Sequence, residues 1–318
     1  MGRGDGEGDF MTRGKKIFIW VISILIVLYI GLIIAASLPQ DSVPAKSLAK
    51  QEDKFVNIKG KEIRYVVQGE GEKTIILVHG FGCSIYSWRN VIPLLSDKYT
   101  VYAFDLPGFG LSDKSPSGNY DLKSQGSFVI DFMDALNIHS AILVGHSMGG
   151  VVVGYAAAEA PERVEKVVLN DAGFYSGGAP SFLKYLFYPL NKLSAIQFYN
   201  KSFVKKLHMG MFYNKELVTD ELVDEYLIAG KTPDAVAVMS KMMTDVGPQQ
   251  YTGISEYITA PTLIVWGEFD PGMPRSDAER LHNEIKNSLP VVIIKNAGHM
   301  VPDEKPEELA KAIKEFVG

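Results

Sequence analysis

The sequence contains one cysteine, Cys83, and no excess of basic residues. A single cysteine cannot form an internal disulfide, so cysteine usage does not decide the redox compartment. The formal net charge is −5, and no basic face argues for nucleic acid as a partner. Internal repeats are also missing. The 318 residues allow one large domain or two ordinary ones, and a hydrophobic content of 47% is enough for a well-buried core.

The amino terminus divides into three segments before the main domain. Residues 1–16 are rich in glycine and cannot bury apolar area, so we expect a disordered tail. Residues 17–36 contain no charged side chain, and at about 1.5 Å per residue they span about 30 Å, the hydrocarbon thickness of a bilayer. The sequence therefore predicts a transmembrane helix over 17–36, a tether over 37–52 and the main domain over 53–318.

The charges that flank this apolar run predict its orientation. Arg13, Lys15 and Lys16 precede it, whereas acidic and basic residues mix after it. The positive-inside rule then places the amino terminus in the cytoplasm and the main domain outside it. A cleavable signal peptide is the alternative, with Ile34-Ala35-Ala36 as the cleavage site and a secreted product. Signal peptides normally have a shorter apolar core, about 7–15 residues, so we favour an uncleaved anchor.

The main domain shows the pattern of an α/β protein. Alternating residues at 55–58 and 63–67 predict an antiparallel hairpin. Continuous apolar runs follow, which are typical of strands buried on both faces of a parallel sheet, and helical patterns separate them. The runs are 75–78, 101–104, 141–144, 167–169, 263–266 and 291–294, and the helical patterns are 85–96, 121–137, 148–160, 275–287 and 304–317. We predict a mostly parallel, doubly wound sheet, with functional residues at the carboxyl ends of its strands.

This alternation is interrupted once. No strand pattern appears between Asp171 and Pro261, where helical segments rich in methionine and aromatic residues occur instead. We expect a helical cap at about 173–258, inserted after a strand and lying over the site. Most of its apolar residues should pack against the core, and some should line an apolar pocket.

A candidate nucleophile lies between the strand at 141–144 and the helix at 148–160. Gly145, Ser147 and Gly149 form Gly-x-Ser-x-Gly, which on a tight strand-to-helix turn holds the serine hydroxyl out from the backbone. Side chains at the glycine positions would crowd that turn. The motif together with its context predicts a nucleophile elbow.

A serine nucleophile needs a histidine base and a carboxylate that orients it. His299 follows the last strand, at the required sheet edge, whereas His79 is better placed to support the turn after its own strand. His146 lies inside the elbow, where we expect its side chain to point away from Ser147 and only to pack. Asp270 follows the strand at 263–266, which gives the chain order serine, acid, histidine of acyl hydrolases. Asp171 is the rival acid, and Glu268 is a weaker one. His139 and His282 look like surface positions, and His208 lies in the expected cap.

The tetrahedral intermediate of acyl transfer also needs two backbone N–H donors. Met148, the residue after the nucleophile, should supply one. The loop His79-Gly80-Phe81-Gly82 should supply the other, with Phe81 as the donor.

These motifs together resemble the α/β-hydrolase superfamily over residues 54–318. The landmarks in order are His79–Gly82, Asp105–Asp113, Gly145–Gly150, Asp270 and Gly298-His299. The resemblance implies an α/β-hydrolase fold and a structural turn at Asp105–Asp113. The elbow is similar to that of monoacylglycerol lipases and related carboxylesterases, some of which carry an amino-terminal membrane helix. Serine at 147 excludes the branches that resemble haloalkane dehalogenases and epoxide hydrolases, which need aspartate there.

We therefore expect a serine hydrolase of carboxylic esters with apolar acyl chains, monoacylglycerols among them, that uses no metal or organic cofactor. Its partners would be a small ester or lipid substrate and the membrane, and the sequence does not indicate an oligomeric state. Carbon–carbon bond hydrolases, cofactor-free haloperoxidases and amidases share the triad and remain alternatives. A membrane-tethered binding protein without turnover is a further alternative, against which the complete set of Ser147, Asp270 and His299 argues.

Overall fold

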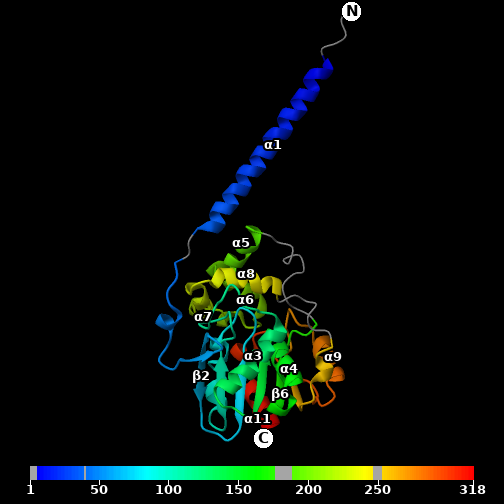
Figure 1. Cartoon of the computed structure of the whole chain (residues 1–318). Helices are drawn as coiled ribbons and strands as arrows, with labels where there is room; N and C mark the ends of the chain where they lie inside the picture. The colour runs from blue at the N-terminus through cyan, green and yellow to red at the C-terminus, as the bar shows by residue number, and fades with distance from the viewer. Residues whose placement is uncertain (1–5, 39–40, 176–187, 246–252) are drawn as a thin grey trace, which may run out of the picture.

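A computed structural model describes residues 6–38, 41–175, 188–245 and 253–318. One eight-stranded sheet forms its centre, with strand order β1-β2-β4-β3-β5-β6-β7-β8 (Figure 1). Only β2 runs antiparallel to its neighbours, and all other adjacent pairs are parallel. The strands are β1 Lys54–Ile58, β2 Lys61–Gln68, β3 Thr74–Val78, β4 Thr100–Phe104, β5 Ala141–His146, β6 Val164–Asn170, β7 Thr262–Gly267 and β8 Val292–Ile294.

The hairpin of β1 and β2 is the one predicted from alternation. Ile58 pairs with Lys61, which leaves Lys59 and Gly60 as a two-residue loop. Both loop residues have positive φ, 51° and 83°, as in the hairpin turns whose twist matches that of the strands. The hairpin thus extends the parallel sheet at its β4 edge.

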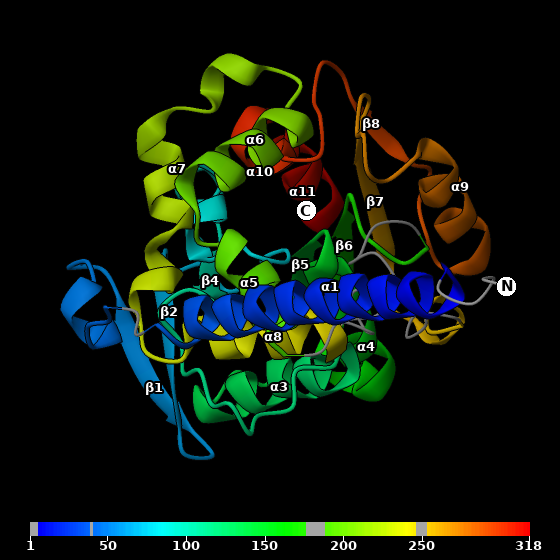
Figure 2. The ribbon, with the colours of Figure 1, turned by 90° about the horizontal axis from the view of Figure 1, so that it is seen from above.

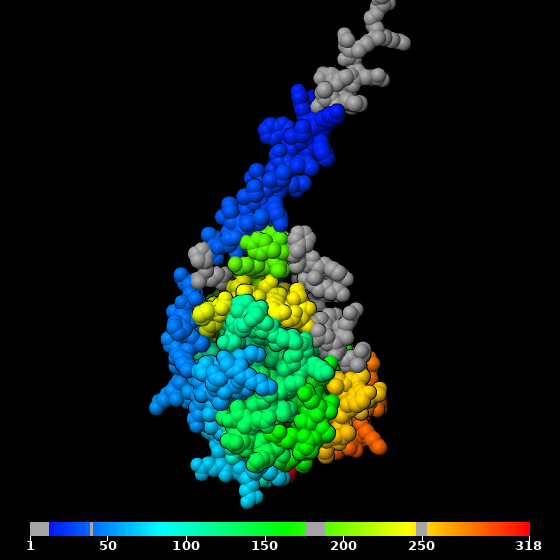
Figure 3. All heavy atoms as spheres, in the orientation of Figure 1, coloured from blue at the N-terminus to red at the C-terminus, as the bar shows by residue number. Residues whose placement is uncertain are grey.

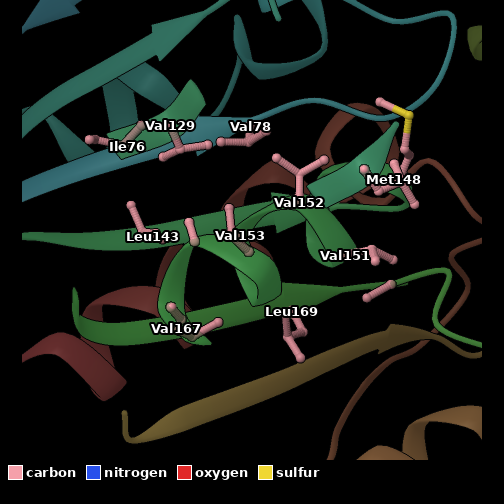
Figure 4. Packing of buried hydrophobic residues seen from close by; sticks show 14 of the residues in the cluster. Ile76, Val78, Val129, Leu143, Met148, Val151, Val152, Val153, Val167 and Leu169 are labelled. Carbon is pink, nitrogen blue, oxygen red and sulfur yellow. The ribbon is translucent and has the colours of Figure 1, made fainter. Parts of the chain in front are cut away.

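Helices cover both faces of the sheet, as expected for a doubly wound fold. The helices α3 Leu122–Ala135, α4 Met148–Glu159 and α9 Arg275–Glu284 bury apolar residues on one face, and α2 Ile92–Leu95 and α11 Pro306–Val317 do so on the other. Figure 4 shows Val151, Val152 and Val153 of α4 over the apolar side chains of the central strands. Because α4 is buried on most sides, Ser147 at its start has a rigid support.

One predicted helix is divided in the structure, and another begins two residues later than predicted. The segment predicted as a helix over 85–96 forms the 3₁₀ helix η2 Ile85–Trp88 and the short α2, and Val301–Glu304 forms a separate helix, α10, before α11. A proline lies in the first turn of each later helix, Pro93 in α2 and Pro306 in α11. Proline fits the first helical turn but clashes with a preceding turn, so each helix begins anew there.

The described residues between β6 and β7 contain helices and no strand. These are α5 Leu190–Gln197, α6 Lys201–Met211, η5 Lys215–Leu217, α7 Asp220–Tyr226, η6 Ile228–Lys231, α8 Ala235–Asp245 and η7 Ser255–Tyr257. They lie over one end of the sheet (Figures 1 and 2), where the cap was expected. Parts of the predicted cap, 176–187 and 246–252, fall outside the described residues.

The amino-terminal helix α1 spans Gly6–Ser37 and projects from the cap side of the molecule (Figures 1 and 3). Its segment Arg13–Ser37 is long and apolar enough to cross a membrane, a test that a signal sequence also passes. The helix begins at Gly6, before the predicted start at Ile17, so it includes residues 6–16 of the segment predicted as a disordered tail. Glycine lowers helix stability by only about 1 kcal/mol per residue, which an adjacent long helix can offset.

The segment that follows α1 is held against the domain. Residues 41–52, predicted as a tether, include the 3₁₀ turn η1 Ala45–Leu48. The Val43 N–H donates to the carbonyl of Lys231 at 2.9 Å, and Lys50 pairs with Glu225 at 2.8 Å. One further 3₁₀ turn, η3 Pro161–Arg163, connects α4 to β6.

Candidate active site

Ser147 lies at the strained turn between β5 and α4. Its φ and ψ are 54° and −121°, a conformation that a non-glycine residue rarely adopts. A Cβ at Gly149 would lie 2.3 Å from the carbonyl oxygen of Val78, and one at Gly145 would lie 2.2 Å from that of Gly149. Only glycine fits at both positions. The turn therefore has the geometry expected of a nucleophile elbow.

Ser147, His299 and Asp270 form one hydrogen-bonded chain. The His299 Nε2 lies 2.9 Å from the Ser147 Oγ, and its Nδ1 lies 2.7 Å from the Asp270 Oδ2. The other Asp270 oxygen accepts the N–H groups of Gly272 and Met273 at 2.8 and 2.9 Å. Burial raises the pKa of Asp270, but the hydrogen bond and charge of His299 outweigh it, so the pKa is lowered. The carboxylate stays ionised beside the imidazole.

The rival acids occupy other positions. Asp171 follows β6, is fully buried and accepts the Gly267 N–H at 2.7 Å, but it makes no hydrogen bond to His299. Burial and the charge of Asp270 raise its pKa well above the usual range. Glu268 is exposed and accepts the Asn296 N–H at 3.1 Å. Asp270 is therefore the carboxylate that orients His299.

One cluster near the triad has the donor types of a metal site. Asp171, Asp270 and His299 place three such atoms within 4.8 Å of one another. The Nδ1 of His299 and the Oδ2 of Asp270 already bond to each other. We assign the cluster to the triad for that reason.

His146 contacts the triad in a way that the sequence did not indicate. Its Nε2 donates to the main-chain carbonyl of His299 at 2.8 Å, and the two ring centroids lie 4.9 Å apart. Burial lowers the pKa of His146 to about 3, so the ring stays neutral. Its role is therefore more than the packing expected of it, since it fixes the backbone of His299.

The remaining histidines lie mostly as expected. His79 donates from Nδ1 to the Gly80 carbonyl and accepts the Leu106 N–H at Nε2, at 2.8 and 3.1 Å. It thereby supports the loop that precedes Phe81. His208 is buried on α6, and His139 is exposed; His282, expected at the surface, is half-buried on α9.

Glu304 is a second residue that sequence reasoning missed. Its carboxylate accepts the N–H groups of Gly298, Tyr213 and Asn214 at 2.8, 2.8 and 2.9 Å. Burial raises the pKa of Glu304, although these backbone donors partly offset that effect. The side chain joins the loop that carries His299 to the chain after α6. Only the position of Glu304 beside the His299 loop could have pointed to it.

The two predicted oxyanion donors both face the site. Phe81 and Met148 line the cavity at Ser147, and neither N–H donates to another described residue. Met148 is the first residue of α4, whose leading N–H groups have no partner within the helix. Both N–H groups are thus free for a ligand.

The Asp105 carboxylate holds the turn after β4, because it accepts the N–H groups of Ile85 and Leu111 at 2.8 and 2.7 Å.

A cavity of about 430 Å³ opens beside Ser147 and His299. The sheet side contributes the oxyanion loop and the elbow, and the described cap contributes mainly apolar side chains. The cap residues include Phe198, Tyr199, Val204, Leu207, Met211 and Met239. Phe198 also contacts Phe81, with ring centroids 5.9 Å apart. The cap therefore forms one wall of the site, as predicted for its aromatic and methionine residues.

Known proteins resemble this chain along most of its length. A hydrolase of unassigned activity from Bacillus subtilis (strain 168), YugF, is 33% identical over 255 residues, which cover 79% of this chain and 92% of that protein. A 2-hydroxy-6-oxononadienedioate/2-hydroxy-6-oxononatrienedioate hydrolase from Cupriavidus pinatubonensis is 29% identical over 83% of this chain and 95% of its own length. The crystal structure of a bacterial membrane phospholipase A superposes with a TM-score of 0.69 at 26% identity, over 98% of both chains.

The family assignment follows from sequence and fold together. The model of the alpha/beta hydrolase fold family matches residues 73–306, which include the elbow, Asp270 and His299. The sheet order, the elbow and the covering helices agree with that match. The chain belongs to the α/β-hydrolase fold family and is a hydrolase.

Proposed function

We propose that the protein is a serine hydrolase that cleaves carboxylic esters with apolar acyl chains through an acyl-enzyme. The observation that carries this proposal is the hydrogen-bonded chain Ser147–His299–Asp270 at the mouth of an apolar cavity. A hydroxyl is a weak nucleophile until a base accepts its proton, and here the base lies at 2.9 Å.

The reaction would proceed in two halves. Ser147 attacks the ester carbonyl while His299 takes its proton, and Asp270 stabilises the imidazolium. The N–H groups of Phe81 and Met148 bind the oxyanion, and the loss of one such donor typically costs about 10²–10³-fold in turnover. His299 then protonates the leaving alcohol. In the second half it deprotonates a water, which releases the acid and restores Ser147.

The membrane helix gives this hydrolase a location. We propose that α1 remains uncleaved, with its amino terminus in the cytoplasm and the hydrolase domain outside. The basic residues before the apolar run support that orientation. The phospholipase superposition covers 98% of this chain, which leaves only about six of the 318 residues unmatched, so the matched region extends into α1. This match also supports an uncleaved helix. Anchorage and the apolar cavity together favour a lipid ester as substrate.

Labelling with a fluorophosphonate tests the nucleophile. The wild-type chain should be labelled, and Ser147→Ala should lose labelling and about 10⁶-fold in kcat, the cost of removing a triad serine elsewhere. Ser202→Ala, an exposed serine on α6, is the matched control and should behave as wild type. Persistent labelling of Ser147→Ala would refute the mechanism.

Nitrophenyl esters of graded chain length test the substrate class. If the acyl chain enters the cavity, kcat/KM should rise by up to about fourfold per CH₂, since each buried CH₂ contributes about 0.8 kcal/mol. The rise should end at the length that fills the cavity. If the protein hydrolysed none of these esters, this substrate class would be excluded even if labelling were intact.

Carbon–carbon bond hydrolysis is the second candidate. The Cupriavidus relative is named for such a substrate and matches 83% of this chain. A 2-hydroxy-6-oxo dienoate should therefore be assayed beside the esters, and preference for it by kcat/KM would favour this alternative.

A further inference from the structure

The acid of the triad has a second carboxylate beside it. Asp171 and Asp270 follow the neighbouring strands β6 and β7, and atoms of Asp171, Asp270 and His299 lie within 4.8 Å of one another. Asp171 is 0% exposed and accepts the Gly267 N–H at 2.7 Å and the Asn170 amide at 2.6 Å. Its φ of 46° is unfavourable for most residues. The fold thus holds this carboxyl group in place at some cost.

Ionisation of both carboxyl groups is unfavourable, because their atoms lie within 4.8 Å in a buried site. Like charges in a buried site raise the pKa of one partner strongly, so that the pair holds one proton. Asp270 keeps the negative charge because it accepts three N–H groups, from His299, Gly272 and Met273. Burial and the charge of Asp270 raise the pKa of Asp171, which favours Asp171 as the partner that carries the proton. A protonated carboxyl is a hydrogen-bond donor.

We propose that Asp171 is a positioning residue that donates a hydrogen bond to Asp270 and serves as a reserve acid for His299. In the intact site it holds the Asp270 carboxylate against His299. When the Asp270 side chain is removed, the like charge that kept Asp171 neutral is gone. Asp171 can then ionise and accept the His299 Nδ1–H after a movement of less than about 2 Å, given the 4.8 Å limit and a hydrogen bond of about 2.9 Å.

This inference rests on the proposed triad and not on the ester as substrate. The rate of fluorophosphonate labelling reports activation of Ser147 whatever the natural substrate is, so it is the main readout. Labelling of the wild type and its loss in Ser147→Ala test the proposed function separately. Failure of the ester assay would leave the labelling comparison intact.

The test is a double-mutant cycle with Asp171→Asn and Asp270→Ala in the full chain. The asparagine amide can still donate to Asp270 and accept from Gly267. It cannot ionise, and its NH₂ group no longer accepts the Asn170 amide. Asp171→Asn alone should therefore change the labelling rate by less than about fivefold. In the Asp270→Ala background, Asp171→Asn should reduce the labelling rate by a factor at least about ten times larger than it does in wild type, because the effects of coupled residues are not additive.

Two further variants complete the design. Asp270→Asn blocks the space that Asp171 needs and imposes the wrong tautomer on His299, so it should lose about 10⁴-fold, more than Asp270→Ala. Asp270→Ser provides a second background if Asp270→Ala does not fold, which thermal melting would show. Equal fold losses for Asp171→Asn in wild type and in the folded Asp270 background would overturn the proposal.

Discussion

His146 illustrates how a single residue supports the site without touching the substrate carbonyl. Its ring is fully buried, and its Nε2–H satisfies the carbonyl of His299. A proton on Nδ1 would charge the ring in an apolar environment, which explains why burial lowers its pKa to about 3. Burial also lowers the pKa values of His79 and His208. The hydrogen bond to His299 thus depends on a neutral imidazole.

These buried histidines predict a loss of stability in acid. In the unfolded chain an imidazole binds a proton below about pH 6.5, whereas the folded His146 stays neutral until about pH 3. The unfolded state therefore binds more protons in this window, and stability falls as the pH falls. His146 alone would contribute on the order of 5 kcal/mol across it.

Thermal melting of His146→Gln measures this term. Glutamine can still donate to the His299 carbonyl, but it does not titrate. As the pH is lowered from about 8 to about 5, the melting temperature of the variant should rise relative to that of wild type. The reason is that the variant lacks the stability loss caused by protonation of His146 in the unfolded chain. His139→Gln, at an exposed histidine, is the control and should show no such change. A pH-independent difference for His146→Gln would contradict the assignment.

At the scale of elements, the loop that carries His299 is joined to cap helix α6. The His299 N–H donates to the carbonyl of Met211 at 2.9 Å, and Glu304 binds Gly298 together with Tyr213 and Asn214. The cap and the loop of His299 therefore share one hydrogen-bond network. A displacement of α6 would move the loop of His299 with it.

Glu304→Ala should break that connection. The change leaves buried N–H groups without an acceptor, at about 1–3 kcal/mol for each unsatisfied group. Residues 211–214 and 296–300 should exchange their amide hydrogens faster, and kcat should fall while the sheet keeps its protection. Glu307→Ala, an exposed neighbour on α11, should have little effect on either. Unchanged exchange at 211–214 would show that Glu304 does not join the two elements.

The sequence predicted the secondary-structure elements well, but it did not predict the side-chain contacts between distant segments. The buried strands, the hairpin at Lys59 and Gly60 and the order of Ser147, Asp270 and His299 were predictable, because each depends on local patterns or on strand ends meeting at one sheet edge. The contacts of His146 and Glu304 join segments distant in the sequence, and no local pattern specifies them. Asp171 was identified only as a rival acid, since its relation to Asp270 depends on the packing of two strands.

For the whole molecule, the contact between α1 and the cap relates the amino-terminal helix to the site. The Tyr29 hydroxyl donates to the carbonyl of Tyr188 at 3.1 Å, and the Ser37 and Tyr188 hydroxyls lie 2.8 Å apart. Tyr188 lies two residues before the start of α5, which contacts both α1 and α8 (Figure 2). Tyr29 lies seven residues before Ala36, about 10 Å along the helix. If 17–36 spans the bilayer, the contact with Tyr29 places this edge of the cap up to about 10 Å inside the hydrocarbon region.

Deletion of residues 1–40 should separate catalysis from access to lipid. The remaining chain keeps the triad and the contacts of Val43 and Lys50, so hydrolysis of a short soluble ester should be nearly unchanged. Hydrolysis of a long-chain ester embedded in vesicles should fall by about 10²-fold or more, because anchorage raises the effective concentration of enzyme at the surface. The ratio of the two rates is the measurement, with Tyr29→Phe as the control that retains the anchor. Equal losses on both substrates would indicate damage to the fold, and unchanged rates on both would show that α1 does not deliver the site to its substrate.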